Sequence, residues 1–197
     1  MPRLPLLSLT LPIVLVVAGC SRQSHEQVQQ KETAAAPAPQ ASESEAEALN
    51  GTLDRSHAGE PLPDVTISGA NGIKLNLAEL KGAPLLVNLW ATWCAPCIAE
   101  MPKLDWLAGQ PGMPRVLAVS EDLKGAAVVN PFLQQHQFLN LQPSLDPDNL
   151  LATGYQANLP TTVLYNAQGK EVWRMQGGYD WSSDKAKALV QEGLAKS

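Results

Sequence analysis

The sequence from residue 61 onward predicts an α/β domain, because segments with strand character alternate along it with segments of helical spacing. Residues 84–90 (PLLVNLW) form a continuous apolar run of strand length, which is typical of a central strand covered on both faces. Residues 98–107 have the apolar spacing of a helix, and we expect Pro102 to kink it. These two neighbouring segments define the predicted centre of the domain.

The remaining elements extend the alternation to the end of the chain. We expect a hairpin with strands at 65–69 and 73–77 around the turn residues 70–72, as an N-terminal extension of the sheet. After the central helix, the pattern predicts a strand at 115–120, a helix at 126–138, a short helix at 146–154, strands at 161–166 and 170–176, and a helix at 183–195. The domain is therefore predicted to span residues 61–197.

The composition supports one well-cored domain with non-globular ends. The chain has 197 residues, of which 45% are apolar and 17% are charged. Its formal net charge is -5, whereas a nucleic-acid-binding surface needs lysines and arginines clustered on one face. We therefore expect no nucleic-acid partner.

Residues 1–19 have the features of an export signal, with a basic start, an apolar stretch over 4–17 and small residues before Cys20. The apolar stretch is shorter than the roughly 20 residues that a membrane-spanning helix needs. The segment VAGC resembles a bacterial lipobox, which implies that Cys20 is lipidated and anchors the mature protein to membrane lipid. The alternative is an ordinary secretory signal cut near Ala18. We expect the domain in the bacterial envelope, on the periplasmic side. If the source is Gram-negative, Ser21 after the lipid cysteine resembles the outer-membrane sorting pattern.

Residues 20–60 are predicted to be a flexible tether between this anchor and the domain. From residue 21 the segment has no aromatic residue and is dominated by Ala, Gln, Glu, Ser and Pro. Such a composition buries too little apolar surface to offset the entropy lost on ordering. A flexible coil of about 40 residues has a root-mean-square reach of roughly 35 Å, which would let the domain meet partners near the membrane.

Cys94 and Cys97 form a C-x-x-C pair, a spacing that occurs in zinc sites and in redox couples. A structural zinc site needs four ligands, and the sequence has no second pair of this kind. Two further alternatives are a copper-delivery module, in which His136 would assist the cysteines, and an inert structural disulfide. A bridge over so short a loop restrains the unfolded chain little, which argues against a purely structural role.

The position of the pair favours redox chemistry. It follows the predicted central strand and opens a helix, where free backbone N–H groups and the helix dipole stabilise a thiolate at Cys94. That thiolate can attack a substrate disulfide, and Cys97, one helical turn further on, can resolve the mixed disulfide. Protein disulfides persist outside the cytoplasm, so exported proteins are the expected substrates.

Two segments carry a family resemblance. VNLWATWCAPCIAEMPKL and NLPTTVLYNAQGKEV resemble the active-site and cis-proline segments of the TlpA/ResA-like branch of the thioredoxin superfamily. The resemblance covers residues 61 to about 194 and implies a thioredoxin-like fold, with a central mixed β-sheet flanked by helices and redox-active Cys94 and Cys97. It also implies a cis peptide between Leu159 and Pro160, beside which a substrate segment could pair with the backbone. The alternative for Pro160 is a trans proline at a strand edge.

Asn88 and Glu100 distinguish the chain from cytosolic thioredoxins. Those proteins resemble it but have a buried aspartate six residues before the first cysteine, where this chain has Asn88, which cannot take a proton. Glu100 lies three residues after Cys97 on the same helix face, and the TlpA/ResA-like pattern includes a glutamate there. Partial burial would raise its pKa toward neutrality and suit it to acid–base catalysis. The alternative is a solvated glutamate in the first helical turns.

Trp93 is expected to form a wall of the site beside Cys94, and Pro96 to stiffen the loop between the cysteines. With Ala95, Pro96 provides no side chain that would strongly stabilise the thiolate, whereas strong oxidants commonly carry such a group. A reductase is therefore favoured over an oxidase or an isomerase of the same fold, which stay as alternatives.

The sequence thus predicts a lipid-anchored thiol–disulfide oxidoreductase that reduces disulfides of exported proteins without a cofactor. Substrate-binding positions are Trp93, Pro96, Leu159 and Pro160, and Glu100 moves protons. The resemblance implies two kinds of partner. One is the exported substrate, with apocytochrome c of cytochrome c maturation as a candidate, and the other is a membrane electron donor that reduces the Cys94–Cys97 pair again.

Overall fold

The computed structural model describes residues 49–69 and 71–195. The predicted export signal, Cys20 and most of the predicted tether lie outside the described residues. Within the described part, no helix is long and apolar enough to cross a membrane.

One mixed sheet organises the described residues. Its strand order is β1-β8-β7-β4-β5-β6-β2-β3, with β4, β5 and β6 parallel to one another and the other neighbours antiparallel. The strands are β1 (Asn50–Asp54), β2 (Thr66–Gly69), β3 (Lys74–Asn76), β4 (Leu85–Trp90), β5 (Arg115–Ser120), β6 (Ser144–Leu145), β7 (Thr161–Tyr165) and β8 (Glu171–Tyr179). The predicted mixed sheet is confirmed, and so is the hairpin of β2 and β3.

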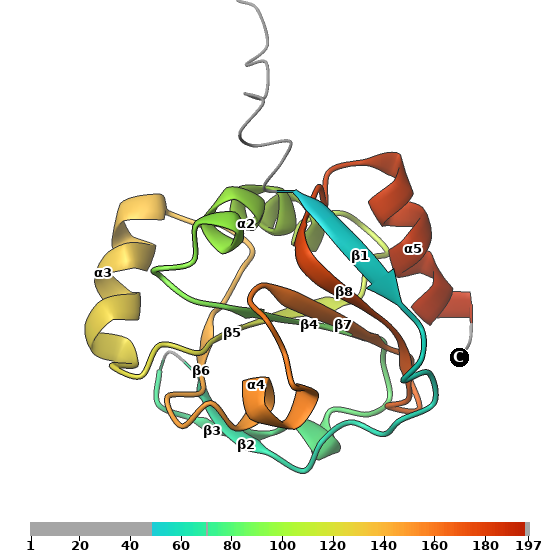
Figure 1. The fold of residues 1–197 in the computed structure, drawn as a ribbon, viewed down its shortest axis with the longest axis horizontal. Coiled ribbons are helices and arrows are strands. Elements are labelled where there is room, and N and C mark those ends of the chain that lie inside the picture. The colour runs from blue at the N-terminus through green and yellow to red at the C-terminus, as the bar shows by residue number, and fades with distance from the viewer. Residues whose placement is uncertain (1–48, 70, 196–197) are drawn as a thin grey trace, which may run out of the picture. The chain divides into compact units, whose positions relative to one another are not determined.

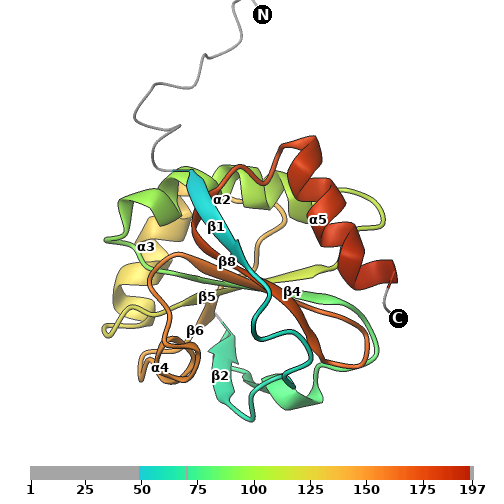
Figure 2. The same ribbon diagram turned by 45° about the vertical axis from the view of Figure 1, so that its right-hand side comes forward.

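Helices cover both faces of the sheet. They are η1 (Leu77–Glu79), α2 (Ala95–Ala108), α3 (Ala126–His136), α4 (Leu150–Tyr155) and α5 (Asp184–Ala195). Figure 1 and Figure 2 show α2, α3 and α5 on one side of the central strands and α4 on the other. Two apolar cores follow from this arrangement, one beneath α2, α3 and α5 and one between the sheet, α4 and η1.

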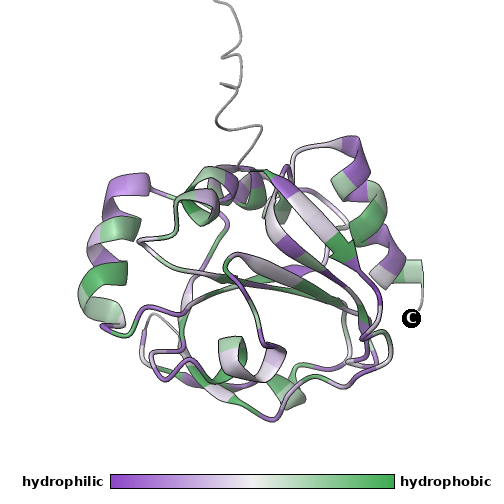
Figure 3. Ribbon diagram, in the orientation of Figure 1, coloured by the Kyte–Doolittle hydropathy of each residue, from purple (hydrophilic) through white to green (hydrophobic). Residues whose placement is uncertain are grey.

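The central strand β4 is buried at all six positions, as its continuous apolar run predicts. It pairs with β5 on one side and with β7 on the other, and its side chains enter both apolar cores, Leu86 in one and Val87 in the other. The surface helix α5 has buried Ala186, Leu189 and Val190 on one face, and Figure 3 shows it in both green and purple. This amphipathic pattern is the one that a helix packed on a sheet requires.

Strand β1 corrects the predicted boundary of the domain. It lies within the segment 20–60 that the sequence predicts to be a tether, yet it pairs with β8, and Leu53 lies opposite Met175. Its side chains are mostly exposed, so it lacks the apolar alternation by which a strand is recognised. Pairing with the nine-residue strand β8, rather than its own composition, makes this segment a strand.

One predicted helix begins later than expected, and the sheet contains one strand that the sequence does not predict. The short helix predicted at 146–154 begins only at Leu150, because the Asp146 carboxylate accepts a hydrogen bond from the Leu151 backbone N–H at 2.8 Å and caps the helix from outside. Strand β6 is only two residues long and was not predicted, since so short a segment carries no periodic signal.

Asp105 on α2 fixes the chain between α3 and β6. Its carboxylate accepts hydrogen bonds from the backbone N–H groups of Leu139, Asn140 and Leu141, with donor–acceptor distances of 3.2, 2.7 and 2.8 Å. The Asn140 side chain returns a hydrogen bond of 3.0 Å to the Asp105 carbonyl. One side chain therefore holds a segment that has no regular structure of its own.

We expect Asp105→Ala to lower the free energy of unfolding by about 2 kcal/mol, because three backbone donors lose a charged acceptor. Urea unfolding followed by circular dichroism measures the change. Asp148→Ala is the matched control, since Asp148 is exposed, and it should change the free energy by less than about 0.5 kcal/mol. Equal midpoints for the two variants would contradict the anchoring role.

Candidate active site at the start of helix α2

Cys94 and Cys97 form a disulfide at the N-terminus of α2, with their Cα atoms 5.2 Å apart. Cys94 is the N-cap residue, and its Sγ accepts a hydrogen bond of 3.3 Å from the Cys97 backbone N–H. The same N–H and the helix dipole can stabilise a thiolate on Cys94 in the reduced protein. Cys94 is 5% exposed and Cys97 is fully buried, so a substrate reaches Cys94 first.

Trp93 and Pro96 flank the disulfide at its exposed side. The Trp93 side chain is 71% exposed, although it follows the buried strand β4 by only a few residues. Pro96 lies in the first turn of α2, where the N–H that proline lacks would have no helical partner. An exposed indole next to a reactive sulfur offers apolar contact area to a polypeptide substrate.

The peptide bond between Leu159 and Pro160 is cis, as the resemblance implies. It directly precedes β7, and the Pro160 carbonyl accepts a hydrogen bond of 2.8 Å from the Gly177 backbone N–H on β8. Leu159 packs against the apolar core that contains both Cys94 and Cys97. Thr161, the residue after Pro160, pairs with Leu89 near the carboxyl end of β4, the end that Cys94 follows. The cis-proline segment and the disulfide, which are separated by more than 60 residues in sequence, therefore lie at the same end of the sheet.

Glu100 is fully buried and forms hydrogen bonds from both of its oxygens. Oε1 accepts a bond of 2.8 Å from Asn88 Nδ2 on β4. Oε2 accepts bonds from the Tyr179 backbone N–H at 2.9 Å and from Trp181 Nε1 at 3.0 Å. The solvated position considered as an alternative for Glu100 is therefore wrong.

Burial raises the pKa of Glu100 to about 7, because desolvation disfavours the carboxylate more than the hydrogen bonds from Tyr179, Asn88 and Trp181 favour it. A carboxyl group that titrates near neutral pH can both take and return a proton under ordinary conditions. Asn88 also donates a hydrogen bond of 2.9 Å to Thr162 Oγ1 on β7, which fixes its amide beside Glu100.

Sequence reasoning missed the donors Tyr179 and Trp181. They lie about 80 residues after Glu100, at the end of β8 and in the segment that leads to α5. No spacing rule links residues so far apart, and a tryptophan near a chain end is usually read as core packing. Only the fold shows that this segment closes over the start of α2.

Asp122 was also missed, and it holds the segment that delivers Cys94. Its carboxylate accepts hydrogen bonds from the Thr92 backbone N–H at 2.9 Å, the Thr92 hydroxyl at 2.8 Å and the Ser120 hydroxyl at 2.9 Å. Because β4 and β5 are parallel, their carboxyl ends lie together, and Asp122 reaches directly from one to the other. The residue before Trp93 is thereby fixed by a buried ionisable group.

His136 does not join the cysteines in a ligand set. It lies at the end of α3 and stacks with Phe132 and Phe138, with ring centroids 4.2 and 5.8 Å apart. Among the residues that the structure describes, no group of three or more His, Cys, Asp or Glu side chains could hold a metal ion. The copper-delivery alternative gains no support from this arrangement.

Several known proteins with similar sequences are named thiol–disulfide oxidoreductases. The model of the AhpC/TSA family matches residues 58–173. The thiol–disulfide oxidoreductase ResA of Bacillus cereus is 30% identical over 128 residues, which cover 63% of this chain and 72% of ResA. ResA of Bacillus subtilis is 33% identical over 121 residues, which cover 58% of this chain and 64% of that relative.

A solved structure agrees with these relatives. The pneumococcal exposed lipoprotein thioredoxin of Streptococcus pneumoniae matches with a TM-score of 0.55 and 26% identity, over 64% of this chain and 98% of that one. The match of the family model covers more than half of the chain and includes both cysteines. The chain therefore belongs to the AhpC/TSA family, with a thioredoxin-like fold and the ResA-like thiol–disulfide oxidoreductases as its relatives.

Proposed function

We propose that this thiol–disulfide oxidoreductase reduces disulfides of exported proteins through Cys94 and Cys97. The observation that carries the proposal is the disulfide at the N-terminus of α2, with one nearly buried and one fully buried sulfur, beside a fully buried carboxyl group. The ResA relatives are named for the same type of reaction. The form that reduces a substrate is the dithiol. The disulfide in this structure is the oxidised form that remains after turnover.

The reaction consists of two exchanges. The Cys94 thiolate attacks one sulfur of the substrate disulfide, forming a mixed disulfide, and the other substrate sulfur leaves as a thiolate that takes up a proton. The Cys97 thiolate then attacks Cys94 Sγ, closes the Cys94–Cys97 disulfide and releases the second substrate sulfur. Two electrons pass from the dithiol to the substrate, and a membrane electron donor must supply them again.

We assign to the Glu100 carboxylate the removal of the proton from the Cys97 thiol. Both side chains are fully buried, and the spacing of three residues places them on one face of α2. A buried thiol needs a base to become a nucleophile, and a carboxyl group with a pKa of about 7 is suited to that transfer. Asn88, Tyr179 and Trp181 are positioning residues, because they act through Glu100.

The substrate-binding positions are Trp93, Pro96, Leu159 and Pro160. An extended substrate segment would pair with the backbone at Leu159, next to the cis peptide, while its side chains contact the exposed indole of Trp93. This arrangement favours polypeptide substrates over small disulfides. Apocytochrome c is one candidate substrate, through the family resemblance.

The envelope location is a further part of the proposal. The pneumococcal exposed lipoprotein thioredoxin supports a place outside the cytoplasm, and the VAGC segment supports a lipid anchor at Cys20. We place the domain on the periplasmic side of the envelope, at the outer membrane if the source is Gram-negative, with residues 20–49 as the tether.

Cys97→Ser should trap the first intermediate, because Cys94 still attacks a disulfide but nothing resolves the product. We expect a stable one-to-one adduct with oxidised glutathione in intact-protein mass spectra of Cys97→Ser. Cys94→Ser should give little adduct, since Cys97 is fully buried. Adducts of equal yield on the two variants would refute the assignment of Cys94 as the attacking sulfur.

Glu100→Gln should remove the pH dependence of the insulin-reduction rate that an acid–base group with a pKa of about 7 confers. The insulin-reduction rate of the unchanged protein should rise between pH 6 and 8, because the ionised Glu100 is the base. The variant should be about 100-fold slower at pH 8 and lack this inflection. Glu79→Gln, an exposed residue, is the matched control and should behave like the unchanged protein.

Stability gives a second readout for Glu100. Its pKa is raised from 4.5 in the reference state to about 7 in the folded protein, so folding favours the protonated form. The stabilisation is complete below pH 4.5 and is lost as the pH rises through 7. In Glu100→Gln this loss should be smaller by an amount on the order of 3 kcal/mol. Burial also raises the pKa of Glu121, which leaves a residual dependence in both proteins.

The reduction potential of the cysteine pair tests the direction of the reaction. Equilibration with dithiothreitol redox buffers, followed by alkylation and mass spectrometry, should give a value near that of thioredoxin, about -270 mV. A potential near -120 mV, the range of the strong oxidant DsbA, would show that the protein is an oxidase instead.

Cys20→Ser tests the lipid anchor in a Gram-negative host. The unchanged protein should incorporate labelled palmitate and sediment with membranes, whereas Cys20→Ser should do neither. The lipid anchor would be contradicted if both proteins are cleaved, carry no palmitate label and appear in the periplasm. In that case the segment is an ordinary secretory signal.

A further inference from the structure

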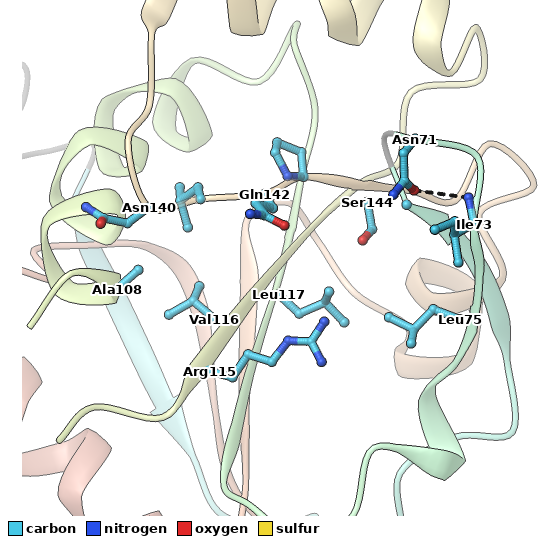
Figure 4. Close-up of a pocket in the computed structure, with 13 residues that line it drawn as sticks. Asn71, Ile73, Leu75, Ala108, Arg115, Val116, Leu117, Asn140, Gln142 and Ser144 are labelled. Carbon is cyan, nitrogen blue, oxygen red and sulfur yellow. Dashed lines mark hydrogen bonds between the residues drawn. The ribbon is translucent and has the colours of Figure 1, made fainter. Parts of the chain in front are cut away.

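A cavity of about 620 Å³ opens between β5, β3 and the segment that leads into β6. Figure 4 shows its lining, with Val116 and Leu117 from β5, Leu75 from β3, and Gln142 and Ser144 on the opposite wall. Its volume lies within the range of ligand-binding cavities. The proposed mechanism does not use it.

The cavity lies at the opposite end of the sheet from the disulfide. Cys94 follows the carboxyl end of β4, whereas the cavity borders Arg115 and Val116 at the amino end of the parallel strand β5. Five strand steps of about 3.3 Å separate these two ends, which makes roughly 17 Å. A ligand bound here therefore does not block the cysteines.

The edge of β5 that faces the cavity has no neighbouring strand. β6 pairs with β5 only at Val119 and Ser120, so the edge from residue 115 to 118 is open. The Asp146 backbone N–H donates to the Ser120 carbonyl, which shows that even-numbered residues of β5 direct their backbone groups to this side. The N–H and C=O of Val116 consequently face the cavity without a backbone partner among the described residues.

An open strand edge is a template for another extended chain. The gap lies where a longer β6 would continue, because the residues before Ser144 turn away toward their hydrogen bonds with Asp105. An added segment would have β5 beside it and the apolar side chains of Leu75 and Leu117 below it. This geometry is that of strand addition.

Arg115 gives the cavity its charge preference. It is the only charged residue among the described residues that line the cavity, and its side chain makes no hydrogen bond or ion pair with the described part of the chain. Figure 4 shows its guanidinium group extending toward Leu75 across the cavity. A guanidinium group binds a carboxylate through two parallel hydrogen bonds.

We propose that this cavity, the β5-edge cavity, binds an extended polypeptide segment of a partner protein that carries a carboxylate side chain. The segment pairs through its backbone with Val116, and its carboxylate binds Arg115. The apolar wall at Leu75 and Leu117 receives the flanking side chains, and the free amide of Gln142 and the hydroxyl of Ser144 lie within the polar wall. This is a partner-binding site separate from disulfide exchange.

The probe is the blocked peptide acetyl-Val-Glu-Val-amide, titrated into the 15N-labelled protein and followed by NMR. We expect saturable shifts centred on the amides of Val116 and Ala118 and slower hydrogen exchange at Val116. The same peptide methylated at every backbone nitrogen should not bind, because it cannot pair with a strand. Acetyl-Val-Gln-Val-amide should bind at least tenfold more weakly.

Two variants test the charge contribution. Arg115→Gln should weaken binding of the glutamate peptide at least tenfold and leave insulin reduction unchanged, since Arg115 is exposed and far from the cysteines. Lys185→Gln, which removes one exposed positive charge on α5, should bind like the unchanged protein. Absence of saturable binding, shifts centred on Trp93 and Cys94, or equal affinity for the glutamate and glutamine peptides would each overturn the proposal.

Discussion

The carboxyl group of Glu100 is buried with no counter-charge among the residues that the structure describes, and the arrangement around the disulfide depends on the hydrogen bonds that this group receives. A buried carboxyl group without hydrogen bonds costs several kcal/mol, so its donors must be in place when the protein folds. They come from two separate parts of the chain: Asn88 on β4, and the Tyr179 backbone with the Trp181 side chain in the segment from the end of β8 to α5. One side chain therefore joins α2 to the centre of the sheet and to the C-terminal segment.

The same burial gives Glu100 its chemistry. Desolvation raises its pKa, while the three hydrogen bonds oppose the rise, and the balance lies near neutrality. With fewer donors the group would stay protonated, and with more solvent it would stay ionised. Since Cys97 is one helical turn away and equally buried, a single packing arrangement both holds the helix and provides the acid–base group that the proposed reaction needs.

The parallel pairing of β4 and β5 divides the sheet into two ends with different properties. At the carboxyl ends, Asp122 ties β5 to Thr92, and Trp93 and the disulfide project beyond it. At the amino end of β5, the shortness of β6 leaves a strand edge open and a cavity beside Arg115. Catalysis and partner binding can thus occupy separate surfaces of one rigid sheet.

Features that depend on neighbouring residues can be predicted from the amino-acid sequence alone. The apolar run of β4, the cysteines at the start of α2, the hairpin of β2 and β3, and the position of Glu100 on the Cys97 face all follow from local spacing, and the cis-proline segment followed from the family resemblance. Strand β1, the donors Tyr179 and Trp181, the Asp122 contacts and the β5-edge cavity were decided only by the tertiary structure. Each of these joins residues far apart in the chain, and such contacts leave no periodic or compositional signal.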